Sequence, residues 1–114
     1  DVFFQSAQHL QLHLVDMGME LEKAHSTAVL AACSLDVKPE MRKKRVSAAQ
    51  AQIGKSGRKI AEEAIQLFGG MGMMEETAVS HYAKRIVMID HWLGDREYHL
   101  TRLEQLIDVS DHEE

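Results

Sequence analysis

The stretch that decides the fold is HLQLHLVDMGMELEKAHSTAVLAA, residues 9–32. Within it, apolar residues recur at alternating intervals of four and three: Leu10, Leu14, Met17, Leu21, Ala24, Ala28 and Ala31. This spacing keeps their side chains on one face of an α-helix. A second row widens the apolar stripe: Leu12, Val15 and Met19. The pattern predicts a helix from about Phe3 to Ser34 that has neighbours on more than one side.

A second long helix is predicted from about Pro39 to Phe68. Pro39 follows a break in the pattern and suits the first turn of a helix, where its missing N–H is not needed. Small and apolar residues then step by three and four: Val46, Ala49, Ile53, Gly57, Ile60, Ala64 and Leu67. Gly54 and Gly57 each cost about 1 kcal/mol relative to alanine inside a helix. We therefore expect them to mark close packing against another helix.

Two shorter helices follow, in EETAVSHYAKRIVMID (residues 75–90) and DREYHLTRLEQLIDV (residues 95–109). Gly94 separates them, and Asp95 is expected to cap the second. Because the connections are short, the fold class is predicted to be all-α: an up-down bundle of about four helices, two long and antiparallel and two shorter. We expect residues 1–109 to form the bundle and residues 110–114 to be a frayed tail.

Composition limits the function classes. The chain of 114 residues is long enough for one domain, and its net charge of −5 argues against a general nucleic-acid binder. The single cysteine, Cys33, excludes an internal disulfide and is expected to be a packed thiol. A cytoplasmic location is the expectation. The sequence has no initiator Met and is amphipathic from its first residues, so we expect it to be a piece of a longer polypeptide.

The turn QLFGGMGMMEE, residues 66–76, is a candidate contact point. Gly69 suits the C′ position of a helix that ends at Phe68. That role explains one glycine, whereas Gly70 and Gly72 indicate an open loop whose amides face a ligand or another subunit. No strand precedes the turn, so it is neither a P-loop nor a dinucleotide-binding strand–turn–helix motif.

Seven histidines raise the possibility of a metal site. His9 and His13 are four residues apart and share a helix face. Di-metal bundles, however, carry Glu-x-x-His pairs on facing helices, and here the motif occurs once, at Glu22 and His25. We therefore predict no metal ligands and no stoichiometric metal in the purified protein.

A family resemblance rests on AQIGKSGRKIAEEAIQLFGGMGMMEETAVSHYAKRIVMIDHWLGD, residues 51–95. Its features follow in order: Gln66, Gly69-Gly70, Gly72 and an acid, His81-Tyr82, and Lys84-Arg85. Upstream, AQHLQLHLVDM (residues 7–17) carries a second motif, and its matching positions are Gln8, Gln11, Asp16 and Met17. Together these motifs resemble the C-terminal helical domain of flavin-dependent acyl-CoA dehydrogenases, over nearly the whole chain.

The resemblance implies a function. In this family the enzyme binds FAD, oxidises an acyl-CoA between its α and β carbons, and passes electrons to an electron-transferring flavoprotein. It implies a homodimer or homotetramer, or a heteromer with a related subunit. It further implies that Gln8 faces the adenine half of FAD. The implied contacts of its pyrophosphate and ribose region are Gln66, Gly69, Gly70 and Gly72. Glycine permits this approach because it has no Cβ.

One departure affects catalysis. The position where the family usually carries its catalytic glutamate holds Leu93, which cannot accept a proton. Three explanations remain open: a base outside this chain, a non-catalytic subunit of a heteromeric enzyme, or Asp90 or Asp95 acting as a weak substitute. No catalytic residue is certain, and the domain alone is predicted to be inactive. The alternative function is an interaction or oligomerisation module without a cofactor.

Overall fold

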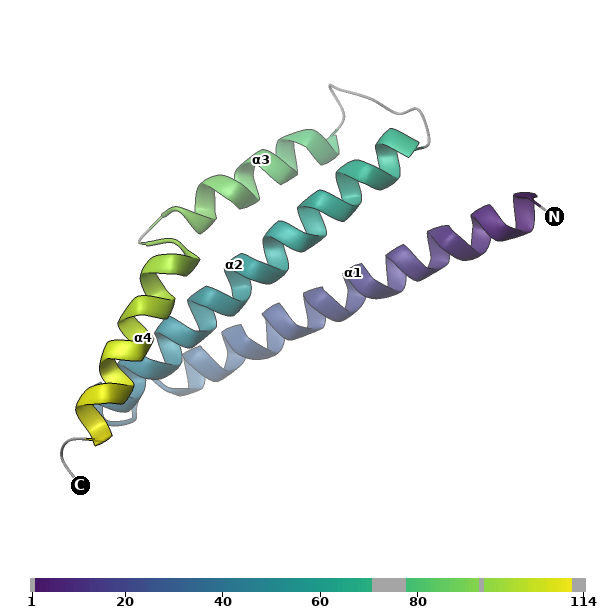
Figure 1. Cartoon of the computed structure of the whole chain (residues 1–114). Coiled ribbons are helices and arrows are strands. Elements are labelled where there is room, and N and C mark those ends of the chain that lie inside the picture. Colours follow the sequence, from purple (N-terminus) through teal and green to yellow (C-terminus); the bar gives the residue numbers. More distant parts are fainter. Residues whose placement is uncertain (1, 71–77, 93, 112–114) are drawn as a thin grey trace.

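The computed structural model describes residues 2–70, 78–92 and 94–111. They form four helices, α1 (Val2–Cys33), α2 (Pro39–Gly70), α3 (Ala78–Asp90) and α4 (Arg96–Asp111). No strand occurs within these three ranges. Figure 1 shows α1 and α2 running antiparallel, with the shorter α3 and α4 on the other side of α2. The predicted all-α bundle of two long and two shorter helices is confirmed.

The helix ends follow local chemistry. Pro39 is the first residue of α2, as predicted. The backbone N–H of Tyr98 donates to Asp95 Oδ1 at 2.9 Å, so Asp95 caps α4 as expected. Gly94 has a φ of 101°, which favours glycine. The C′ assignment for Gly69 is wrong, because α2 continues through Gly70.

Helix α2 is the centre of the molecule. Among the described residues, the extensive helix–helix contacts are those of α1, α3 and α4 with α2. The molecule measures 61 × 28 × 23 Å, and its radius of gyration is 17.9 Å. A compact domain of this length would have a radius of gyration of about 13 Å. The chain is therefore elongated, and much of each outer helix faces solvent.

The glycines inside α2 mark its contact with α3, as predicted. A Cβ built on Gly54 would lie 2.0 Å from Asp90 Oδ1, and one on Gly57 would lie 2.9 Å from Ile86 Cγ2. Both distances are too short for a real Cβ contact. Helices α2 and α3 therefore pack closely at Gly54 and Gly57, where α2 has no side chain. The Asp90 side chain lies directly against the backbone at Gly54.

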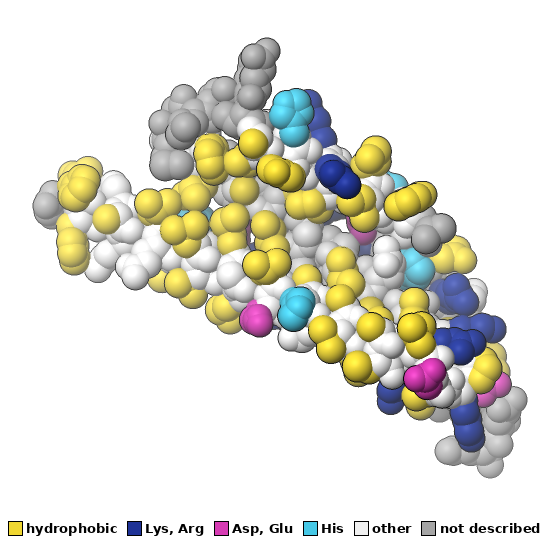
Figure 2. Space-filling model, turned by 180° about the vertical axis from the view of Figure 1, so that it is seen from behind, with side chains coloured by type: hydrophobic (Ala, Val, Ile, Leu, Met, Phe, Trp, Pro, Cys, Tyr) yellow, Lys and Arg dark blue, Asp and Glu magenta, His cyan; other side chains and the backbone are white. Residues whose placement is uncertain are grey.

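Among the described residues, the fully buried hydrophobic ones are all alanines, and many of the large apolar residues are exposed. The buried hydrophobic side chains are Ala49, Ala51, Ala61 and Ala83. The second apolar row of α1 lacks a neighbour within the described residues, because Leu12, Val15 and Met19 are 64%, 54% and 56% exposed. Figure 2 shows hydrophobic side chains exposed along the length of α1. Cys33 is also exposed, so the expectation of a packed thiol is wrong.

A charged network joins α1 to α2. Glu20 is only 4% exposed, and its Oε2 accepts a hydrogen bond from Ser56 Oγ at 2.9 Å. Its Oε1 lies 3.2 Å from Lys23 Nζ and 3.5 Å from Lys59 Nζ. The Ser56 hydrogen bond, followed by the two lysine charges, lowers the pKa of Glu20 against the opposing effect of burial. The carboxylate is therefore held in its charged form where the long helices meet.

This network predicts acid sensitivity. Because the pKa of Glu20 is lowered in the folded state, its contribution to stability is present above the usual glutamate pKa of about 4.3 and is lost as the pH falls through the lowered value. Glu20→Gln should reduce the pH dependence of the unfolding midpoint in that acid range. Urea unfolding followed by circular dichroism at several pH values measures this. Glu104→Gln, at an exposed position of α4, is the control and should leave the dependence unchanged.

Candidate functional site

An open groove separates the beginning of α1 from the end of α2. Its volume is about 820 Å³, and its lining is mainly apolar, with contributions from Phe3, Leu10 and Leu67. Figure 1 shows the cause: α1 diverges from α2 towards its N-terminus. The two helices pack closely at Glu20 and Ser56, and beyond that contact the groove opens.

The groove collects some of the predicted cofactor residues. Gln66 and Gly70 line it, opposite the first turns of α1. Gly69 precedes Gly70 at the exposed end of α2. Gln8 is exposed on α1, and the groove lining does not include it. Gly72 lies outside the described residues. The fold thus brings the end of α2 to the first turns of α1, but it does not turn Gln8 inward.

Two histidines, His9 and His13, also line this groove. Their spacing of four residues in the sequence predicts that they share one face of α1. His9 Nε2 and His13 Nε2 lie 3.0 Å apart. On the opposite side of the His13 ring, Nδ1 lies 3.9 Å from Glu63 Oε2 of α2. That oxygen is buried and has no hydrogen-bond partner in the part of the chain that the structure describes. The position of Glu63 could not be inferred from the sequence, because it depends on how α1 and α2 are aligned.

A second cavity, of about 430 Å³, contains both candidate bases. Asp90 is 6% exposed, and its Oδ2 lies 3.3 Å from Arg58 Nη2. Its buried Oδ1 has no hydrogen-bond partner among the described residues. Asp95 uses Oδ1 to cap α4, and its Oδ2 lies 3.9 Å from His91 Nδ1. Leu93 lies outside the described residues. Of the two acids, Asp90 is therefore the one with a buried oxygen that receives no hydrogen bond from any described residue.

Two further classes of feature were searched for in the described part of the chain. No group of three or more His, Cys, Asp and Glu side chains is arranged there to hold a metal ion. None of the four helices, as far as they are described, combines the length and apolar character needed to cross a bilayer.

Comparison with known proteins identifies the family. Residues 4–107 match the family model described as "Acyl-CoA dehydrogenase, C-terminal domain". Searches of curated proteins and of solved structures gave no significant match. The matched segment begins in the first turn of α1 and ends in the last part of α4, so it includes all four helices. The motifs, the four-helix architecture and this match agree, and the chain belongs to the acyl-CoA dehydrogenase family through its C-terminal domain.

Proposed function

We propose that this chain is the C-terminal bundle of an FAD-dependent acyl-CoA dehydrogenase that acts in the cytoplasm. The complete enzyme would oxidise the α,β bond of an acyl-CoA thioester, transfer hydride to FAD and deliver electrons to an electron-transferring flavoprotein. The bundle would supply FAD contacts and the oligomer interface. Within the chain, residues 1–109 would act as one unit and residues 110–114 as a tail.

The observation that carries this proposal is the groove at the end of α2. Gln66 and Gly70 line it, and apart from the adjoining part of the helix no atom of the described residues lies within 4 Å of the place where a Cβ on Gly70 would stand. Its volume of about 820 Å³ lies within the range of sites that hold cofactor-sized ligands. An extended dinucleotide could therefore approach the bare backbone at Gly69 and Gly70. Gln8 and Gly72 would contact it from outside the described lining.

The exposed apolar rows support an assembly of several bundles. Monomeric proteins rarely leave so much contiguous apolar surface in water. A second copy, or a related subunit, would pack on the outer face of α1. It would bury the second apolar row of that helix, which the bundle itself leaves exposed. The isolated chain is accordingly expected to self-associate at high concentration.

Catalysis by this chain would depend on Asp90 or Asp95. Asp90 has an oxygen to which no described group donates a hydrogen bond, but that oxygen is buried against Gly54. Asp95 is committed to the cap of α4. A general base must come within hydrogen-bond reach of the proton that it removes. A base outside this chain, or a non-catalytic subunit with a catalytic partner, therefore accounts better for these positions.

The test uses the complete polypeptide that carries this domain. We expect it to purify with a visible flavin spectrum, and we expect a panel of acyl-CoA thioesters to bleach that spectrum under anaerobic conditions. Asp90→Asn and Asp95→Asn should both retain bleaching if the base lies elsewhere. Loss of bleaching in one variant, with flavin retained, would assign the base to that residue.

The cofactor site has its own control. Gln66→Ala should weaken FAD binding by about tenfold, the usual effect of one lost hydrogen bond in a ligand site. Gln105→Ala, at an exposed position of α4, should leave FAD binding unchanged. Flavin that binds without bleaching would indicate a silent subunit. A protein without flavin, and unable to take it up, would contradict the enzyme assignment and leave the interaction module.

A further inference from the structure

We propose that His9 and His13 form an exchangeable binding site for a divalent transition-metal ion, with Glu63 fixing the orientation of His13. The site lies in the groove between α1 and α2, and it does not depend on the enzyme assignment. It would be separate from the predicted flavin contacts, although it opens onto the same groove.

The distance between the two rings suits a chelate. His9 Nε2 and His13 Nε2 lie 3.0 Å apart on successive turns of α1. A metal ion about 2.1 Å from both nitrogens would then hold them at an angle of about 90°. That angle is the one that tetragonal Cu²⁺ and Ni²⁺ prefer, whereas tetrahedral Zn²⁺ would need the nitrogens farther apart.

The ring orientation agrees with this geometry. The ring centroids lie 4.4 Å apart, and the ring planes are inclined at 89°. Two imidazoles joined end to end by a straight N–H···N bond would place their centroids farther apart than this. The two rings are instead arranged edge to face with their Nε2 atoms close together, and this arrangement is compatible with both nitrogens binding a third atom.

Glu63 provides a second, independent observation. Its Oε2 atom is buried, has no hydrogen-bond partner within residues 2–70, 78–92 and 94–111, and lies 3.9 Å from His13 Nδ1. A histidine that binds a metal through one nitrogen commonly donates its other N–H to a carboxylate. A proton on Nδ1, facing Glu63, leaves the Nε2 lone pair of His13 free for the metal. A movement of about 1 Å would turn the contact into a hydrogen bond.

A metal ion at this site would exchange readily with solvent, because only two protein side chains would bind it. The described residues offer no third carboxylate, thiol or imidazole to the same point. Water from the open groove would complete the coordination, so we expect binding to be weaker than at a structural zinc site with four protein ligands. Such a site would release its metal during purification. The proposal therefore departs from the prediction of no metal ligands made from the sequence, but it agrees with the prediction of no stoichiometric metal in the purified protein.

The experiment is a Cu²⁺ titration of the full-length protein, produced without a histidine tag and treated beforehand with a chelator. Competition with a chromophoric chelator measures the affinity, and electron paramagnetic resonance reports nitrogen ligands on Cu²⁺. We expect one Cu²⁺ per chain with hyperfine structure from two nitrogens. His9→Gln and His13→Gln should each weaken this binding at least tenfold.

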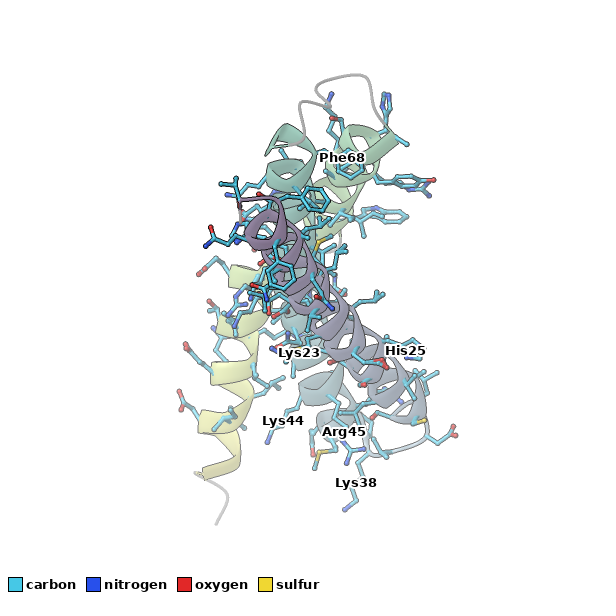
Figure 3. All side chains as sticks on the ribbon, turned by 90° about the vertical axis from the view of Figure 1, so that its right-hand side faces the viewer. Lys23, His25, Lys38, Lys44, Arg45 and Phe68 are labelled. Atoms are coloured by element: carbon cyan, nitrogen blue, oxygen red, sulfur yellow. The ribbon has the colours of Figure 1, made fainter. Side chains whose placement is uncertain are left out.

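The matched control is His25→Gln on the same helix. His25 is exposed, away from the groove (Figure 3), and has no histidine one turn before or after it. This variant should bind Cu²⁺ as the unchanged protein does. Glu63→Gln keeps both ligands and should weaken binding about tenfold, the lower end of the effect of losing such a carboxylate.

Two results would overturn the proposal. Affinity that is unchanged in both His9→Gln and His13→Gln would exclude the chelate, and equal losses in His25→Gln would show that copper binds histidines without selection. Unchanged affinity in Glu63→Gln would overturn the role of Glu63. The helix content of each variant, measured by circular dichroism, separates these results from unfolding, since His9 is exposed and His13 is half-buried.

Discussion

Replacing Gly54 with alanine is expected to lower the free energy of unfolding by about 3 kcal/mol. The new Cβ would lie 2.0 Å from Asp90 Oδ1 and 3.0 Å from Asp90 Cγ, so the carboxyl group would have to move. Asp90 is buried on a short side chain, and its Oδ2 is paired with Arg58 at 3.3 Å. Moving it separates α3 from α2 or leaves a buried carboxylate without its cation.

The same substitution elsewhere provides the control. Gly18 lies inside α1, and apart from the adjoining part of the helix no described atom lies within 4 Å of its Cβ position. Gly18→Ala should therefore raise the free energy of unfolding by about 0.5–1 kcal/mol through helix propensity. Among the described atoms, a Cβ at Gly57 would meet only the Ile86 methyl group, at 2.9 Å, and that group can shift. The change in the free energy of unfolding for Gly57→Ala should therefore fall between those of the other two variants. Urea unfolding of the three variants tests this order. Similar values for Gly18→Ala and Gly54→Ala would contradict the close packing of α3 on α2.

Self-association should be lost when charge is placed on the outer row of α1. The double substitution Leu12→Lys and Met19→Lys is expected to weaken association at least 100-fold, because two lysines would be buried in an apolar contact. Leu12 and Met19 are 64% and 56% exposed in the single chain, so the folded bundle should tolerate the change. Sedimentation velocity over a range of concentrations measures the effect.

The control for that prediction adds the same charge on another helix. Thr101→Lys with Gln105→Lys changes two exposed positions of α4 and gives the same net charge. It should associate as the unchanged protein does. If both double variants become monomeric together, general repulsion and not the α1 row would explain the effect. If neither does, another surface holds the copies together.

The periodic parts of the fold could be predicted from the sequence because local rules decide them. Steps of three and four gave both long helices nearly to the residue. Asp95 was identified as a cap because its side chain reaches a backbone N–H three residues on. Gly54 and Gly57 were assigned to close packing because glycine is costly inside a helix unless another helix needs the space.

The remaining features depend on relations between helices. The sequence predicts Gly69 outside α2, but the helix continues through Gly70. A C′ residue adopts the left-handed backbone conformation. Glycine can adopt that conformation, but its presence in the sequence does not require it. Similarly, helical spacing placed Leu12 and Met19 on one row without revealing what would cover them. Whether Gln8 or Gln66 lines the groove depends on the angle at which α1 leaves α2. The spacing of apolar residues along each helix does not determine that angle.

The central place of α2 determines how this chain can come apart. Each of the other three helices is attached mainly to α2 and only slightly to one another. Fluctuations that begin at an outer helix can therefore release that helix and leave the others attached, as in the separate opening of cooperative units known from many proteins. A substitution that unfolds α2 would instead release all three outer helices together, because α2 provides the surface on which each of them packs. Substitutions in the outer helices should therefore destabilise one helix at a time, whereas substitutions in α2 should destabilise the whole bundle.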